Sequence, residues 1–252
     1  MFHAGLTARD RLEEVLGTEA LATLREVSLL ARDLAPQLPP IKRGDDVVVL
    51  VHGFFASAGV FRPMRARLEQ ELGARVASFS HTPGARVDTI ARNLQRLMDR
   101  IPTGARIHLV GHSLGGVVSR YYVQELGGHR RVAQTISLAS PFGGAQVATA
   151  LRFFMVGADL HRESSVLRRL RASSQSHDVP HTSIVAGDDR LISGLTRAVF
   201  PGHDAVILHG RGHNSLLYDE EVIRVVIDRI RQAQRQAQRQ AQRHAPYGSV
   251  KQ

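Results

Sequence analysis

A serine lies between two glycines in Gly111-His112-Ser113-Leu114-Gly115, directly after an apolar run at residues 106–110 and before a helix-like segment. A strand, a sharp turn and a helix with a serine at the apex form a nucleophile elbow. Glycines are expected there because the turn strains the backbone and because larger side chains would collide with the neighbouring strand and helix. In a chain with 22 glycines the pattern alone can arise by chance. Its meaning therefore depends on partners for Ser113.

An activated serine needs a base that takes its proton and a group that orients the base. His213 follows an apolar run at 204–209 and lies in a glycine-flanked loop, where its ring is free to point across the ends of neighbouring strands. Two carboxylates, Asp188 and Asp189, follow another apolar run at 181–186. The sequence thus predicts Ser113 as a nucleophile and His213 as its base, with the orienting aspartate open between two neighbours.

The elements that must position these side chains alternate along the chain. Short apolar strands are predicted at 46–51, 75–79, 106–110, 132–138, 181–186 and 204–209, and helices at 60–72, 85–100, 114–126 and from about residue 216. This alternation predicts an α/β fold with a mostly parallel sheet and helices on both faces. Chemistry in such sheets gathers at the carboxyl ends of the strands, where Ser113, His213 and the His52-Gly53 turn would all lie.

Several blocks of sequence resemble the α/β-hydrolase superfamily, and its lipase and esterase branch most closely. They are Val-His-Gly-Phe at 51–54, Gly-His-Ser-Leu-Gly-Gly at 111–116, Ser-Leu-Ala-Ser-Pro-Phe-Gly-Gly at 137–144, and the aspartate and histidine loops. The block at 137–144 is similar to the Thr-Pro-His-x-Gly segment of lipases, with Ser140 in place of Thr and Phe142 in place of His. The resemblance spans roughly residues 46–228, and the order serine, aspartate, histidine is the order of the superfamily.

This resemblance implies a serine hydrolase that cleaves carboxylic esters through an acyl-enzyme, with Ser113, Asp189 and His213 as the catalytic triad. The family pattern, an aspartate followed two residues later by a hydrophobic pair, favours Asp189. Asp188 is the main alternative, and Asp204 or another carboxylate fits less well.

The backbone N–H groups of Phe54 and Leu114 would bind the oxyanion. His52 and His112 lie beside the site, and we interpret them as packing and hydrogen-bonding residues.

The segment at 145–178 is where this fold commonly carries a cap. Its apolar patch, made of Leu151, Phe153, Phe154, Met155 and Val156, suits either an acyl chain or a helix buried on the sheet. Residues 165–170 resemble a recurrent helix start in the lipase branch, so part of the insert is expected to be scaffold. A small cap favours a lipophilic ester as substrate.

Two further segments flank the α/β-hydrolase domain at 41–230. Residues 1–40 are predicted to be a helical appendage that packs through an apolar stripe: Leu21, Leu24, Val27, Leu30, Ala31 and Leu34. Residues 231–252 form a basic tail that repeats Arg-Gln-Ala-Gln without an apolar stripe, so we expect a frayed and partly disordered extension.

Composition limits the partners. The net charge is +10, but half of it is supplied by Arg231, Arg235, Arg239, Arg243 and Lys251. Nucleic-acid binding is therefore not expected, and a weak contact of the tail with anionic surfaces is the one such interaction left open. There is no cysteine, and no pattern for zinc, calcium, a phosphate loop or another cofactor. The sequence has neither a signal peptide nor an apolar run long enough for a membrane span, which favours a cytoplasmic location.

The residues leave other activities open. A thioesterase, an acyltransferase or an amidase would use the same triad. A catalytically silent scaffold used for binding would keep the fold without the chemistry. The oligomeric state is not determined by the sequence.

Overall fold

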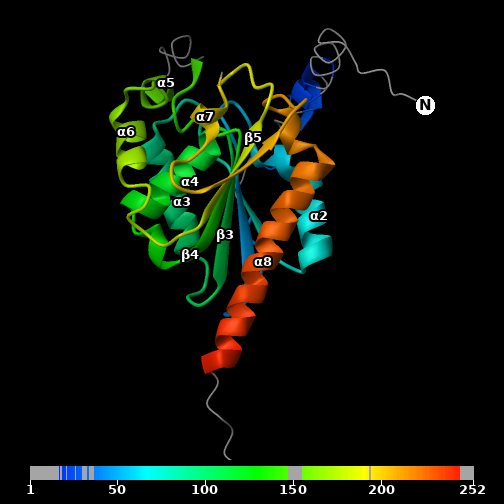
Figure 1. Cartoon of the computed structure of the whole chain (residues 1–252). Helices are drawn as coiled ribbons and strands as arrows, with labels where there is room; N and C mark the ends of the chain where they lie inside the picture. The colour runs from blue at the N-terminus through cyan, green and yellow to red at the C-terminus, as the bar shows by residue number, and fades with distance from the viewer. Residues whose placement is uncertain are drawn as a thin grey trace, which may run out of the picture.

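The computed structural model describes residues 17, 19–20, 22–25, 27–29, 33, 37–146, 155–192 and 194–244 (Figure 1). Its centre is one six-stranded sheet in the order β2-β1-β3-β4-β5-β6, with every neighbouring pair parallel. The strands are β1 (Asp46–Val51), β2 (Arg75–Phe79), β3 (Arg106–His112), β4 (Val132–Leu138), β5 (His181–Ala186) and β6 (Asp204–Leu208). The predicted α/β fold with a parallel sheet is confirmed.

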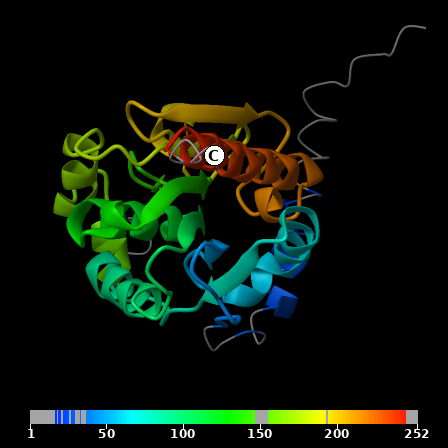
Figure 2. The same cartoon turned by 90° about the horizontal axis from the view of Figure 1, so that it is seen from below.

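Helices cover both faces of the sheet. They are α2 (Arg62–Leu72), α3 (Val87–Met98), α4 (Leu114–Glu125), α5 (Met155–Asp159), α6 (Ser165–Ala172), α7 (Leu195–Ala198) and α8 (Glu220–His244), with 3-10 turns η1 (Ala58–Phe61), η2 (Gly128–Arg130) and η5 (Ser215–Leu217). Helices α3, α4 and α6 lie on one side of the sheet and α2 and α8 on the other, as Figure 1 shows and Figure 2 repeats from below.

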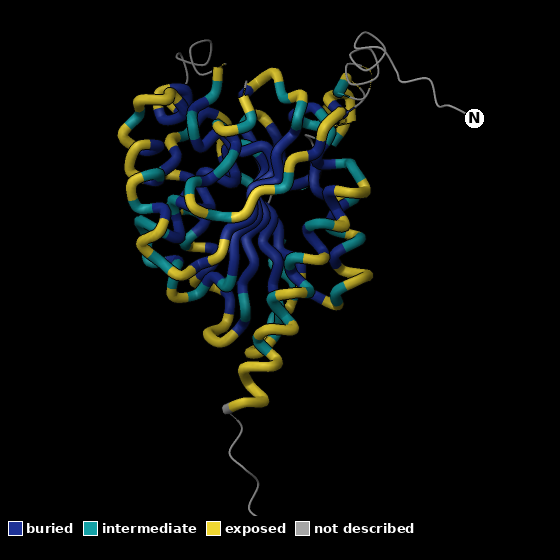
Figure 3. The backbone as a smooth tube through the Cα atoms, viewed as in Figure 1, coloured by how far each residue is buried: buried dark blue, intermediate teal, exposed yellow. Residues whose placement is uncertain are grey.

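The central strands are buried on both faces, so they are apolar without interruption (Figure 3). Along β1, Val47, Val49 and Val51 pack in the core under α3 and α4, whereas Val48 and Leu50 pack under α2 and α8. This alternation follows from the two-residue period of a strand.

The strand order reverses between β1 and β3, because the chain steps outward from β1 to β2 and then crosses back to the other side of β1. Open parallel sheets bind ligands in the crevice at the carboxyl ends of the two strands where the order reverses. Gly53 follows β1 and Ser113 follows β3, so both residues lie at this point of the sheet.

The last helix differs from the expectation. It begins at Glu220, after η5, and continues to His244, so the Arg-Gln-Ala-Gln repeat is helical as far as the structure describes it. The prediction of a frayed extension from residue 231 was wrong because arginine, glutamine and alanine are good helix formers. The junction is also held to the domain, since Gln234 donates from Nε2 to Asp46 Oδ2 at 3.1 Å. Residues 245–252 lie outside the described residues, and a contact of the tail with anionic surfaces stays a prediction.

The described residues between 17 and 29 in the N-terminal appendage are helical, but two residues of the predicted apolar stripe are exposed. Leu24 and Val27 are 66% and 59% exposed, whereas Ala22 is buried. The expected burial of these two stripe residues was wrong because the segment contacts the domain through polar groups, described below. The other members of the stripe lie outside the described residues. No described helix is both long enough and apolar enough to cross a bilayer.

Candidate active site

The nucleophile elbow has the geometry that its sequence requires. Ser113 follows β3 with φ 52° and ψ −119°, a strained conformation for a residue with a side chain, and α4 begins at the next residue. A Cβ on Gly111 would lie 2.4 Å from the carbonyl carbon of Gly115, and a Cβ on Gly115 would lie 2.0 Å from the carbonyl oxygen of Val51. Glycines at these two places therefore let β3, α4 and β1 approach one another at the turn.

His213 and Asp189 form a buried pair. His213 Nδ1 lies 2.7 Å from Asp189 Oδ2, and both side chains are less than a tenth exposed. The other carboxylate oxygen, Oδ1, accepts hydrogen bonds from the backbone N–H groups of Leu191 (2.8 Å) and Ile192 (3.1 Å). Burial raises the pKa of Asp189, but the hydrogen bond and charge of His213 and the two backbone donors outweigh it, so the pKa is lowered overall.

The other two candidate aspartates have different partners. Asp188 Oδ2 accepts a hydrogen bond from the Gly210 N–H at 2.6 Å and so closes the loop that precedes the histidine. Asp204 is the first residue of β6, at the amino end of the strand, and pairs with Arg229 at 3.0 Å. Of the three carboxylates, the structure brings Asp189 to the imidazole.

A cavity of about 150 Å³ joins the serine and the histidine. Its lining is mostly apolar and comes from the turns after β1, β3 and β4, from the end of α5, and from the loops that carry Asp189 and His213. The lining residues are Gly53, Phe54, His112, Ser113, Pro141, Ala145, Leu160, Leu191, Ile192, His213 and Asn214. The two sides of the cavity thus bring together Ser113, His213 and the turn of Phe54, which are far apart in the sequence.

The two residues predicted to donate N–H groups, Phe54 and Leu114, lie beside the serine. Leu114 is the first residue of α4, and a helix does not satisfy the N–H groups of its own first turn. Phe54 lines the cavity from the turn after β1. The next residue, Phe55, has φ 55°, another left-handed conformation of a residue with a side chain, and its ring is half exposed.

Paired histidines hold the turn after β1. The rings of His52 and His81 stack with centroids 4.0 Å apart. His52 Nδ1 lies 2.8 Å from the Gly53 carbonyl, to which it can only donate, and its Nε2 accepts from the His81 backbone N–H at 3.2 Å. Burial lowers the pKa of His52 to about 3, with the neighbouring His81 adding to the shift, so the ring is neutral and its tautomer is fixed.

His112 contacts the histidine loop from the elbow. Its Nε2 lies 3.1 Å from the backbone carbonyl of His213 and therefore donates to it. Burial and then the proximity of His213 lower the pKa of His112 to about 3, so the ring is neutral and Nδ1 carries no proton. That buried Nδ1 has no hydrogen-bond partner among the described residues. The two histidines beside the site thus hold backbone in place, in the hydrogen-bonding role expected from the sequence.

The described part of the insert is scaffold. Asp159 is buried at the end of α5 and accepts hydrogen bonds from Arg86 at 3.0 Å and from the Val87 N–H at 2.9 Å, which ties the insert to the start of α3. Ser164 caps α6, and this helix starts where its resemblance to lipases predicted. Of the apolar patch, Met155 is exposed and Val156 is buried, while Leu151, Phe153 and Phe154 lie outside the described residues.

Two further points concern the surroundings of the site: metal ligands and a contact from the N-terminal segment. Within the described ranges, no three histidine or carboxylate side chains lie close enough together to hold a metal ion. Glu19 contacts the loop after His213, and its place in the sequence did not predict this contact. A glutamate in an amphipathic helix gives no signal of a contact 195 residues away.

A model of the alpha/beta hydrolase family matches residues 48–178, more than half of the chain. With this match, the sheet order and the elbow, the chain belongs to the alpha/beta hydrolase family.

Solved structures similar to this fold include the mature lipase BlEst2 of Bacillus licheniformis, which is 14% identical, with 74% of this chain and 94% of that chain covered and a TM-score of 0.59. A structure from a study of carboxylesterases of the thaumarchaeon Nitrososphaera gargenis is 16% identical, covering 80% and 96%, with a TM-score of 0.61. Carboxylesterase CesB of Bacillus subtilis is 16% identical, covering 86% and 97%, with a TM-score of 0.54. At these identities the likeness concerns the fold.

Proposed function

We propose that this protein hydrolyses carboxylic esters by acyl transfer to Ser113, with His213 as general base and Asp189 as the residue that orients the imidazole. The observation that carries the proposal is the buried His213 Nδ1–Asp189 Oδ2 contact of 2.7 Å beside a cavity that Ser113 and His213 both line. The likeness of the fold to lipases and carboxylesterases supports the same chemistry.

The roles follow from the contacts. Asp189 accepts a hydrogen bond from the Nδ1–H of His213, which leaves Nε2 unprotonated. Nε2 can then take the hydroxyl proton of Ser113 as the oxygen attacks the ester carbonyl. The imidazolium then protonates the alcohol as it leaves, and water releases the acid from the acyl-serine by the same route.

The oxyanion needs donors fixed before the reaction. We assign this role to the N–H groups of Phe54, which lines the cavity together with Ser113, and of Leu114, which follows Ser113 at the start of α4. Each donor of this kind stabilises the transition state by about 3–4 kcal/mol. The stacked pair of His52 and His81 supports this role, because it fixes the backbone turn that carries Phe54.

An apolar acyl group is the substrate feature that the cavity favours. Phe54, Leu160, Leu191 and Ile192 give the cavity an apolar wall without a cationic side chain among its lining residues. Such a wall binds hydrocarbon and offers no partner for a carboxylate or phosphate on the acyl side. We therefore propose a small-molecule or lipid ester with an uncharged, lipophilic acyl chain.

The test is hydrolysis of p-nitrophenyl esters of increasing acyl length by the wild type and by Ser113→Ala. The exposed Ser176 provides the matched control variant, Ser176→Ala. We expect kcat to fall by about 10⁶ in Ser113→Ala, as for other serine nucleophiles, and to be unchanged in the control. Ester cleavage at the wild-type rate by Ser113→Ala would refute the proposal, and a preference for charged acyl groups would refute the substrate class.

A further inference from the structure

The described N-terminal segment reaches the loop that carries the proposed base. Glu19 Oε1 accepts a hydrogen bond from the Asn214 N–H at 2.7 Å, and Oε2 accepts one from the Ser215 N–H at 3.0 Å. These N–H groups belong to the two residues that follow His213, at the start of η5. Hydrogen bonds from backbone N–H groups to a carboxylate are charge-assisted, so they are stronger than neutral ones.

Within the described residues, the bonds of Glu19 bridge a space between the segment and the loop. A cavity of about 220 Å³ lies between the segment, at Glu19 and Thr23, and the two loops that carry Asp189 and His213. Across this space Asn214 Nδ2 reaches Thr23 Oγ1 only at 3.4 Å. Among the described residues, the two bonds to Glu19 are therefore the shortest polar links between the segment and the loop.

The loop transmits this constraint to the histidine. The hydroxyl of Ser215 accepts from the Gly212 N–H at 2.9 Å and lies 3.0 Å from the Gly212 carbonyl, so the backbone on both sides of His213 forms one closed turn. A carboxylate that holds Asn214 and Ser215 therefore also holds the backbone of His213.

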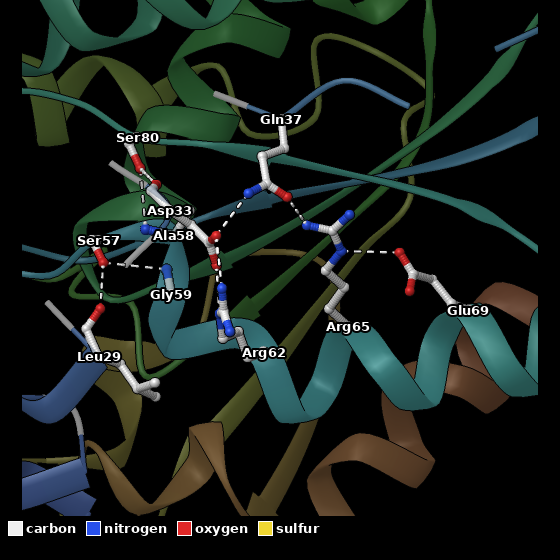
Figure 4. A network of polar contacts seen from close by, with 10 residues as sticks. All are labelled: Leu29, Asp33, Gln37, Ser57, Ala58, Gly59, Arg62, Arg65, Glu69 and Ser80. Carbon is white, nitrogen blue, oxygen red and sulfur yellow. Dashed lines mark hydrogen bonds and ion pairs between the residues drawn. The ribbon is translucent and has the colours of Figure 1, made fainter. Parts of the chain in front are cut away.

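The segment is also bonded to the domain farther along the chain, at Leu29 and Asp33 (Figure 4). Ser57, just after the turn of Phe54, donates to the Leu29 carbonyl at 3.1 Å. Asp33 pairs with Arg62 at 2.8 Å, and its carbonyl accepts from Ser80 at 2.8 Å. The same segment thus contacts the region of the proposed oxyanion donor and the loop of the proposed base.

We infer that Glu19 is a positioning residue for His213, and that the N-terminal segment is part of the catalytic unit rather than an appendage. The inference rests on the proposed ester hydrolysis. Glu19 touches neither substrate nor reacting atoms; it acts by keeping the His213 backbone where the imidazole meets both Asp189 and Ser113. Because small displacements of a catalytic base reduce the rate steeply, its removal acts on kcat more than on KM.

The experiment compares Glu19→Ala and Glu19→Gln with the wild type and with Glu125→Gln. Glu125 is a matched control, since it makes one ion pair with Arg169 at 3.3 Å at the far end of α4. Active sites are counted with a fluorophosphonate, and kcat for a p-nitrophenyl ester is expressed per titrated site. We expect kcat to fall about tenfold or more in Glu19→Ala with KM within about twofold. Glutamine has one acceptor oxygen for two N–H groups, so Glu19→Gln should lie between alanine and wild type.

The outcomes are distinct. A Glu19→Ala kcat per titrated site within about twofold of wild type overturns the inference and leaves ester hydrolysis intact, because a merely structural role lowers the number of active sites and not the rate of each. A wild type that neither reacts with the probe nor cleaves the ester refutes both. If Glu19→Ala does not fold, hydrogen exchange is measured instead for the peptide containing Asn214 and Ser215, in the wild type and in Glu19→Gln. Protection in the wild type and faster exchange in the variant support the inference, and equal exchange overturns it.

Discussion

Replacement of Asp189 by asparagine separates orientation of the base from stability of the loop. The asparagine Oδ1 can still accept from the N–H groups of Leu191 and Ile192, which Asp189 Oδ1 now does at 2.8 and 3.1 Å. The amide nitrogen then faces His213 Nδ1, where the carboxylate oxygen now lies at 2.7 Å. Because an amide nitrogen only donates, Nδ1 must become the acceptor and the proton moves to Nε2.

The ring then has the wrong tautomer for a base. A protonated Nε2 cannot take the proton of Ser113, and the same substitution in a serine protease triad reduces kcat by about 10⁴. At about 1.4 kcal/mol for each factor of ten, we expect Asp189→Asn to lose about 5–6 kcal/mol of transition-state stabilisation.

The assay is kcat per titrated site on a short-chain p-nitrophenyl ester, with thermal unfolding as the control for folding. Asp188→Asn is the matched variant: its amide oxygen can still accept from Gly210, as the carboxylate does at 2.6 Å, so we expect a change of less than about threefold. A kcat within tenfold of wild type for Asp189→Asn, or a larger loss for Asp188→Asn, would refute the assignment of the orienting aspartate.

Three further predictions concern stability. Gly115→Ala should destabilise the fold by more than about 3 kcal/mol because its Cβ would lie 2.0 Å from the Val51 carbonyl oxygen. Gly17→Ala is the control and should be neutral, since no atom of the described residues outside its own helix lies within 4 Å of its Cβ. Urea unfolding measures both variants, and equal midpoints would contradict the geometry. His52 and His112 have folded pKa values lowered to about 3, so below pH 6.5 the unfolded chain binds more protons than the folded chain. Their contribution to stability is complete above pH 6.5 and is lost as the pH falls toward 3, with about 4 kcal/mol lost by pH 5 for the pair. Urea midpoints that do not move between pH 7.5 and 5 would argue against it. Arg120 is fully buried, has no carboxylate partner among the described residues and has a pKa lowered by burial to about 10. Arg120→Met should therefore leave the urea midpoint unchanged or raise it, while Arg120→Ala should lower the free energy of unfolding by about 3 kcal/mol. A strong loss of stability in Arg120→Met would show that the charge itself is needed.

Strands buried on both faces were the part of the fold most visible in the sequence. An uninterrupted apolar run such as Val47–Val51 is typical of a strand that is buried on both faces of a sheet. Four of the predicted strands have the observed bounds. The elbow was equally visible because its geometry is local: a Cβ at Gly111 or Gly115 would collide with backbone at the turn, so glycine is required at both positions.

Contacts between distant segments were not visible. Asp188 and Asp189 both follow β5, and only the path of the loop decides that one carboxylate meets Gly210 and the other His213. The burial of Leu24 and Val27 was wrongly predicted for a related reason: both fit an apolar stripe, but the described residues of this segment contact the domain through Glu19 and Asp33. Polar anchors of this kind carry no periodicity that a sequence pattern can reveal.

The most direct test of the central claim is the site of covalent modification by a fluorophosphonate. This probe reacts with a serine only when a base activates it and donors stabilise the charge on the phosphoryl oxygen. We predict one adduct per chain, mapped by mass spectrometry of the proteolysed protein to the peptide that contains Ser113, and no adduct in Ser113→Ala. An unmodified Ser113 in folded wild type, or an adduct that persists at another serine in Ser113→Ala with ester hydrolysis retained, would contradict the account.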